Sequence, residues 1–148
     1  MSNRDKLPLA ATHLVRDTCM CLHVQRAARA VARRFDEALR PLGLTSGQFS
    51  LLMSLNRAEP PSIGQVSAVL AMDRTTLNAN LKPLERRGLL RVSVDDADRR
   101  SRRLGLMPTG RSLLIRALPV WKRTQLATES LLGRSNPDAM RADLRKLS

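Results

Sequence analysis

The chain has 148 residues, enough for one domain with a buried core and too few for a multi-domain enzyme. It carries 26 Lys and Arg against 13 Asp and Glu, and the resulting formal charge of +13 favours a polyanionic partner, most often nucleic acid. Hydrophobic residues make up 43% of the chain, which excludes a basic disordered tail. Aromatic residues make up only 2%, so duplex DNA is a better partner than RNA or single strands, whose binding modules stack bases on aromatic rings.

Compartment and metal chemistry follow from what the sequence contains. No apolar run approaches the roughly 18 residues that cross a bilayer, and the first twelve residues lack a continuous apolar stretch, so we expect a cytoplasmic protein with no membrane partner and no signal peptide. Cys19 and Cys21 cannot build a disulfide framework, and His13 and His23 do not complete a zinc-ligand spacing. We therefore expect no metal, no cofactor and no enzymatic activity.

The first predicted element is one long helix from Leu14 to Leu42. Its apolar positions step by three and four residues, from Cys21 through Phe35 to Leu42, as in a packed helix. The basic residues between these positions are Arg26, Arg29, Arg33, Arg34 and Arg40. The pattern predicts an amphipathic helix with a solvent-exposed basic face. Pro41 and Gly43 are expected to end this helix.

A second helix is predicted to begin after Thr45, because Gln48 three residues later completes a capping-box pattern. A third, short helix is expected over residues 62–70, and a fourth begins after Asp73. Only three residues connect these last two helices, a spacing typical of a helix-turn-helix.

The fourth helix has two distinct faces. Leu77, Leu81 and Leu84 recur at the spacing of a core-facing stripe. The outward residues that we expect to reach a major groove are Arg74, Thr75, Asn78 and Lys82, and Thr76 is counted with them as a DNA-binding candidate. Asp73 is suited to cap this helix, and Pro83 predicts a bend beyond its base-reading half.

A β-hairpin is predicted next, with strands over residues 89–94 and 104–107 around a turn at 95–98. The turn and the returning strand carry Arg99, Arg100, Arg102 and Arg103. A basic hairpin directly after a recognition helix predicts a winged helix-turn-helix, whose wing contacts the DNA backbone or enters the minor groove. A fifth helix from Gly110 to about Leu132 and a terminal helix after Asn136 complete a fold that is mainly helical with a small β-hairpin wing.

Five motifs follow one another in a characteristic order along the chain: Met72-Asp73-Arg74-Thr75-Thr76-Leu77, Leu84-Glu85-Arg86-Arg87-Gly88-Leu89, Asp98-Arg99-Arg100-Ser101, Leu104-Gly105-Leu106 and Thr109-Gly110. Together they resemble the MarR family of bacterial transcriptional regulators. The resemblance implies a winged helix-turn-helix dimer. It also implies that Arg100 enters the minor groove and that Asp98 braces it. The run of arginines in the hairpin adds Arg99 and Arg102 as further candidate wing contacts.

The resemblance also implies how the chain is organised. We expect a single domain over residues 1–148, with dimerisation helices at 12–42 and 109–148 and a DNA-binding lobe at 45–107. The family's usual Leu-Thr-x-x-Gly after the wing is Met107-Pro108-Thr109-Gly110 here, a departure that concerns entry into the fifth helix.

The cysteines allow two interpretations. A cysteine early in the first helix is similar to the OhrR-type sensors of organic hydroperoxides, whose reactive thiol is assisted by tyrosines that this chain lacks. The alternative is that Cys19 and Cys21 are small apolar core residues at the dimer interface, with Cys21 on the buried face. Two residues so close in one helix point about 200° apart, so a disulfide would have to join two chains.

An effector site is the remaining candidate. Family members commonly bind a small aromatic or phenolic anion between the dimerisation helices and the DNA-binding lobe. Trp121 is either a core residue or a platform for such a ligand, and the candidate cations are Arg16, His23 and Arg26.

Together these features predict a homodimeric, sequence-specific DNA-binding regulator, expected to be a ligand-responsive repressor on a pseudo-palindromic operator. One alternative is a thiol-based peroxide sensor acting through Cys19 or Cys21. Another is a non-specific architectural DNA binder, which the amide and hydroxyl groups of Asn78, Asn80 and Thr75 disfavour because charge-only binding does not need them.

Overall fold

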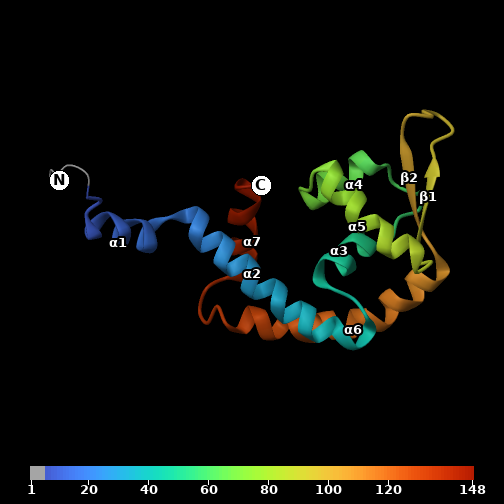
Figure 1. Ribbon diagram of the computed structural model, residues 1–148. Helices are drawn as coiled ribbons and strands as arrows, with labels where there is room; N and C mark the ends of the chain where they lie inside the picture. The colour runs from blue at the N-terminus through green and yellow to red at the C-terminus, as the bar shows by residue number, and fades with distance from the viewer. Residues whose placement is uncertain (1–5) are drawn as a thin grey trace.

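A computed structural model describes residues 6–148 of the chain (Figure 1). Its α-helices are α1 (Leu9–Thr18), α2 (Met20–Leu39), α3 (Ser46–Ser54), α4 (Ile63–Leu70), α5 (Arg74–Arg86), α6 (Pro108–Ser130) and α7 (Pro137–Lys146). A short 3-10 helix, η2 (Arg40–Leu42), follows α2, and strands β1 (Leu90–Val94) and β2 (Arg102–Leu106) form an antiparallel hairpin. The expected fold class, mainly helical with a hairpin wing, is confirmed.

The prediction of one continuous helix from Leu14 to Leu42 is wrong, because the helix is interrupted at Cys19. There the backbone is extended, with φ −67° and ψ 109°, and the Cys19 N–H donates to the Val15 carbonyl as the last bond of α1. The Cys19 sulfur then accepts from the Leu22 N–H at 3.5 Å and so acts as the N-cap of α2. Period-three and period-four spacing continues through this position, and therefore the pattern alone did not locate the break.

The helix-turn-helix prediction is confirmed. Thr45 and Gln48 form a reciprocal capping box at α3, and Ser62 and Gln65 form another at α4. The turn between α4 and α5 is closed by Ala71 in the left-handed conformation, with φ 49°. Local side-chain to backbone bonds thus fix where these helices begin.

One hydrophobic core joins α2, α3, α4, α5, the hairpin and α6. Its fully buried side chains include Leu39, Leu51, Leu52, Val66, Leu77, Leu84 and Leu104. Leu81 is also buried, so the predicted core stripe of α5 is confirmed, and the helix continues through Pro83 to Arg86.

The first strand of the hairpin begins one residue later than predicted, and the second strand begins two residues earlier. Leu90 pairs with Leu106 at its base and Val94 with Arg102 near its tip. The loop after α3 joins its edge, because the Leu104 N–H donates to the Pro61 carbonyl at 2.9 Å. The wing is therefore anchored to the segment between α3 and α4.

Helices α2 and α6 lie along each other at the base of the view, while α1 extends away from the body and α7 turns back toward α2 (Figure 1). Helix α6 begins at Pro108, two residues before the expected Gly110. A Cβ atom at Gly110 would lie 2.2 Å from the Leu89 carbonyl oxygen, so only glycine lets α6 approach the turn after α5 this closely. Over the described part of the chain, every helix is too short or too polar to pass through a bilayer.

Candidate nucleic-acid interface

Helix α5 presents a polar surface opposite its buried leucines. Arg74, Thr75, Asn78 and Lys82 are all exposed, as the sequence predicted. Thr76 is exposed as well, but both its N–H and its hydroxyl donate to the Asp73 carboxylate, each at 2.8 Å. Thr76 therefore takes part in the helix cap, whereas the other four side chains have no protein partner within residues 6–148.

The cap also sets the charge state at the start of α5. The two bonds from Thr76 hold the pKa of the Asp73 carboxyl below its usual range. A negative charge at this point is stabilised by the N-terminal end of the helix dipole. Asp73 thereby fixes the first turn of α5, from which Arg74 and Thr75 project.

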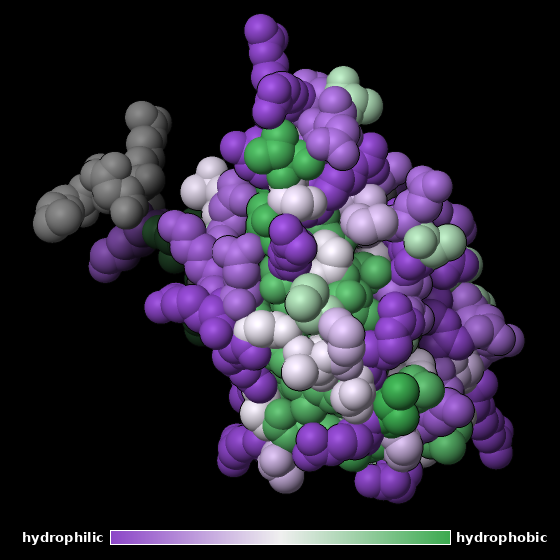
Figure 2. Space-filling model, turned by 90° about the vertical axis from the view of Figure 1, so that its right-hand side faces the viewer, coloured by the Kyte–Doolittle hydropathy of each residue, from purple (hydrophilic) through white to green (hydrophobic). Residues whose placement is uncertain are grey.

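The tip of the wing is a tight turn that carries two exposed arginines. Asp98 accepts from the backbone N–H of Arg100 at 3.0 Å, and its carbonyl accepts from the Ser101 N–H at 2.8 Å. Asp98 thus supports Arg100 through the backbone, while the side chains of Arg99 and Arg100 are exposed. In Figure 2, the projection at the top of the molecule, where the wing ends, is hydrophilic.

The other two wing arginines are tied to the protein. Arg102 donates to the carbonyls of Arg99 and Ser101, each at 3.2 Å. The Arg103 Nε lies 2.8 Å from the Asp95 Oδ2, and its Nη1 donates to the Pro60 carbonyl at 3.2 Å. The ion pair between Arg103 and Asp95 was not predicted from the sequence. The hairpin prediction already placed Asp95 and Arg103 on opposite sides of one turn, which was the available signal.

Asp95 is the buried partner of this pair. Its Oδ1 accepts from the Ala97 N–H at 2.9 Å, and that bond, together with the Arg103 guanidinium, holds the pKa of the Asp95 carboxyl below its usual range. We call the contacts among Asp95, Arg103 and Pro60 the wing clamp. A second tie lies on the other strand, where the Glu85 carboxylate of α5 accepts from the Val92 N–H at 2.9 Å. The wing is thus held from both α5 and the loop after α3.

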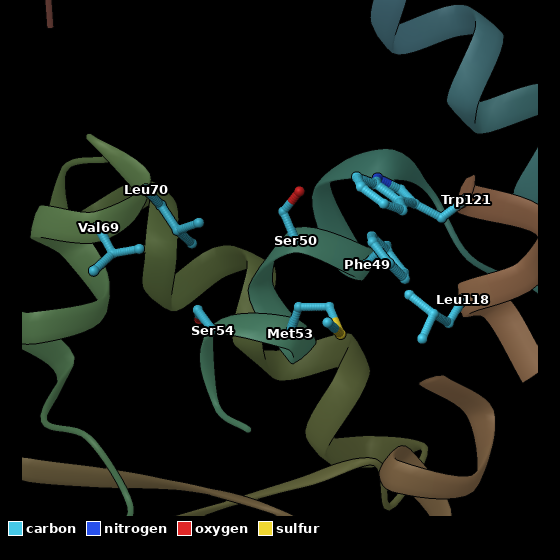
Figure 3. Close-up of a pocket in the computed structure, with 8 residues that line it drawn as sticks. All are labelled: Phe49, Ser50, Met53, Ser54, Val69, Leu70, Leu118 and Trp121. Atoms are coloured by element: carbon cyan, nitrogen blue, oxygen red, sulfur yellow. The ribbon is translucent and has the colours of Figure 1, made fainter. Parts of the chain in front are cut away.

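The predicted effector residues do not come together. Trp121 stacks on Phe49 with ring centroids 6.2 Å apart, at the edge of a cavity of about 410 Å³ between α3, α4 and α6 (Figure 3). The lining residues are Phe49, Ser50, Met53, Ser54, Val69, Leu70, Leu118 and Trp121. None of them is charged, so the walls of this cavity offer a ligand apolar surface and two serine hydroxyls.

The three cationic side chains that were expected to bind the effector lie elsewhere on the chain. Arg16 pairs with its neighbour Asp17 at 2.6 Å, and His23 Nδ1 lies 2.8 Å from the Cys19 carbonyl oxygen. Arg26 lies in a separate hollow on α2 with two other arginines. Trp121 and the three cations thus do not line one pocket.

Cys21 is exposed in the single chain, as are Val24 and Val31 of the same apolar stripe, so its burial at a dimer interface stays a prediction. One expectation about the cysteines is wrong. Cys19 is half-buried at the break between helices, so the two cysteines do not share one continuous helix and the 200° argument does not apply. In residues 6–148 no group of three His, Cys, Asp or Glu side chains could hold a metal ion.

A recognition helix with a polar outward face, preceded by a tight helix pair and followed by a clamped basic hairpin, defines a winged helix-turn-helix protein. A MarR family model matches residues 42–101. The Mycobacterium tuberculosis transcriptional regulator MosR, solved in complex with DNA, has 35% sequence identity, a TM-score of 0.78, and coverage of 88% of this chain and 93% of its own. The chain belongs to the MarR family, as its motifs suggested.

Two further relatives were found. The HTH-type transcriptional regulator TtmR of Methylorubrum extorquens (strain PA1) is 33% identical over 97 residues, which are 66% of this chain and 50% of TtmR. The chain therefore spans about half the length of that curated relative. BpsR of Bordetella bronchiseptica, whose DNA binding is regulated by 6-hydroxynicotinic acid, has 30% identity, a TM-score of 0.74, and coverage of 86% of this chain and 91% of its own. Membership in a family of transcriptional regulators agrees with the prediction that the chain is not an enzyme.

Proposed function

We propose that this protein is a homodimeric, sequence-specific regulator of transcription that acts in the cytoplasm as a repressor on a pseudo-palindromic duplex. The observation that carries the proposal is the outward face of α5, where Arg74, Thr75, Asn78 and Lys82 are exposed and have no side-chain partner in the described part of the chain, beside the arginines of the wing tip. Arginine can pair with guanine and asparagine with adenine in the major groove, so this face combines base-reading groups with phosphate-binding charge. MosR, a relative at 35% identity, was crystallised with DNA, which supports the same partner here.

A second copy of the chain would cover apolar surface that the single chain leaves open. Helix α2 exposes Val24 and Val31, α6 exposes Leu126, and α7 exposes Met140 and Leu144. These residues belong to the segments 12–42 and 109–148 that we assign to dimerisation, leaving 45–107 as the DNA-binding lobe. Light scattering at micromolar concentration should give the mass of a dimer, and a monomer mass would refute this assembly.

Selection of bound sequences from a random duplex pool tests the function directly. We expect enrichment of a pseudo-palindrome with half-sites about one helical turn apart, because two recognition helices related by a twofold axis read successive major grooves. Binding without any enrichment would instead identify a non-specific architectural binder. Absence of binding would refute both.

We assign the cavity beside Trp121 to the effector and propose that it takes a small aromatic ligand. Its uncharged walls offer stacking on Trp121 and Phe49 and hydroxyls from Ser50 and Ser54. BpsR, whose DNA binding responds to 6-hydroxynicotinic acid, supports a ligand of this size. Trp121 is the only tryptophan, so its fluorescence reports the site. Titration with 6-hydroxynicotinate and with neutral phenol should change the emission and operator affinity together, and a Trp121→Leu variant should lose the effect of the ligand on DNA binding.

Thiol control is the second candidate, favoured by the position of Cys19, which is half-buried at the break between α1 and α2. A thiol outside a packed interface is reachable by peroxide in a way that a packed one is not. Mild peroxide should lower operator affinity and a thiol reductant should restore it, and serine at the responsible position should abolish the response. Unchanged affinity after peroxide would mean that the cysteines have no sensing role.

A further inference from the structure

Helix α2 carries a hollow of about 400 Å³ on the surface that the proposed function does not use. Its lining residues are Arg26, Ala27, Arg29, Ala30 and Arg33. The three arginines are exposed and follow one another at spacings of three and four residues, so they project from one side of the helix. The alanines between them are small, which leaves room for a ligand to approach the helix backbone.

These arginines lack the partners that other cations of the chain have. Arg16, Arg103 and Arg141 each pair with a carboxylate. Within residues 6–148, the side chains of Arg26, Arg29 and Arg33 make neither an ion pair nor a hydrogen bond to the protein. Their guanidinium groups are therefore available to an external anion.

The nearest acidic residues of α2 do not neutralise the group. Asp36 accepts the Ser46 N–H at 2.6 Å, so its carboxylate is used to position the start of α3. Glu37 follows Arg33 by one helical turn but does not pair with it among the described residues. Like charges three and four residues apart repel each other and destabilise a helix. Electrostatic repulsion that no contact within the protein offsets is typical of functional sites.

The hollow also lies away from the recognition surface. Phe35 and Leu39 of α2 are buried in the core, and at 100° per residue Arg26, Arg29 and Arg33 lie about 130° around the helix from them. DNA bound to α5 and the wing therefore does not need this side of α2.

We propose that Arg26, Arg29 and Arg33 form a binding site for a compact ligand that carries two or three linked phosphates. The forked guanidinium group matches phosphate oxygens in a bidentate geometry, and three of them within about 10 Å of helix length can surround a short phosphate chain. A volume of about 400 Å³ suits a small ligand. A second duplex is disfavoured, because even a single DNA-binding module buries about 600 Å² or more, which three residues of one helix do not provide.

Isothermal titration with sodium tripolyphosphate tests this site. The protein would carry Arg99→Gln and Arg100→Gln, so that the wing tip does not bind the probe. Against this background, the triple variant Arg26→Gln, Arg29→Gln, Arg33→Gln should lose about tenfold or more in affinity, as expected for lost charge-assisted bonds. The matched control is Arg116→Gln, Lys122→Gln, Arg123→Gln on α6, which removes equal charge from exposed positions and should bind like its parent.

The outcomes separate this site from bulk electrostatics and from the proposed function. Equal loss in both triple variants, or no saturable binding by the parent, would overturn the site. Pyrophosphate and ATP form two further arms: similar affinity for ATP and tripolyphosphate means that the phosphate chain is recognised, and binding of ATP alone would overturn the proposal. No DNA is present, so failure of operator binding does not affect the result, and matching melting temperatures confirm that the variants fold.

Discussion

Neutralising Arg100 should flatten the salt dependence of DNA binding by an amount that the structure predicts. On each protomer, the basic side chains on the outward face of α5 and at the wing tip that are exposed and have no protein partner in residues 6–148 are Arg74, Lys82, Arg99 and Arg100. A dimer thus offers about eight charges for phosphates, and with a slope of about −0.9 per contact the logarithm of affinity should fall with a slope near −7 in the logarithm of salt. Raising salt from about 50 to 200 mM should then weaken binding by about 10⁴.

Arg100→Gln removes two of these charges per dimer and should make the slope less negative by about 2. Fluorescence anisotropy of a labelled duplex carrying the selected operator, repeated across this salt range, gives the slope. Arg123→Gln on α6 is the control, because it removes the same charge from outside the interface and should leave the slope unchanged. Equal slopes for Arg100→Gln and the parent, or an equal change in the control, would refute the assignment of the wing tip to phosphate contact.

Three other variants test separate parts of the structure. Asn78→Ala should cost about 1–3 kcal/mol on the selected operator and much less on random duplex in the same anisotropy assay, and equal losses would remove Asn78 from base reading. Gly110→Ala should lower the free energy of unfolding in urea by about 3 kcal/mol, because its Cβ would meet the Leu89 carbonyl. Gly47→Ala, whose Cβ would meet only the Thr45 hydroxyl oxygen at 4.0 Å, should be neutral or stabilising. The pKa of Asp73 is lowered in the folded state, so its carboxylate contributes fully to the free energy of unfolding above about pH 4, and this contribution is lost as pH falls through the folded-state pKa. In urea unfolding, Asp73→Asn should therefore lose less stability than the parent between about pH 6 and pH 3.

Local signals in the sequence predicted most of the DNA-binding lobe. Capping residues such as Thr45 and Asp73 act on backbone groups three residues away, and the leucine spacing of α5 directly reports which side is buried. These interactions involve only neighbours in the chain, and for that reason they could be recognised without a structure.

The features that the sequence did not reveal depend on distant contacts or on a choice between two local states. The wing clamp joins Arg103 to Pro60, 43 residues earlier, and no local pattern marks such a bond. At Cys19 the apolar spacing agreed with a helix on both sides, yet a sulfur cap and extended backbone interrupt it. The effector residues were grouped by chemistry, whereas Trp121 and Arg26 lie in different cavities.

Two hydrogen bonds attach the wing to the loop after α3, so we expect these two parts to move together. Helix α3 forms a wall of the Trp121 cavity through Met53 and Ser54. In the loop that follows it, the Pro60 carbonyl accepts from Arg103 and the Pro61 carbonyl accepts from the Leu104 N–H. The φ angles of these prolines are fixed and both are bonded to the hairpin, so a displacement of Pro60 and Pro61 would move β2 with it unless both hydrogen bonds break. A molecule that enlarges the cavity and shifts the loop after α3 would therefore tilt the wing, and with it the arginines at its tip, without touching α5.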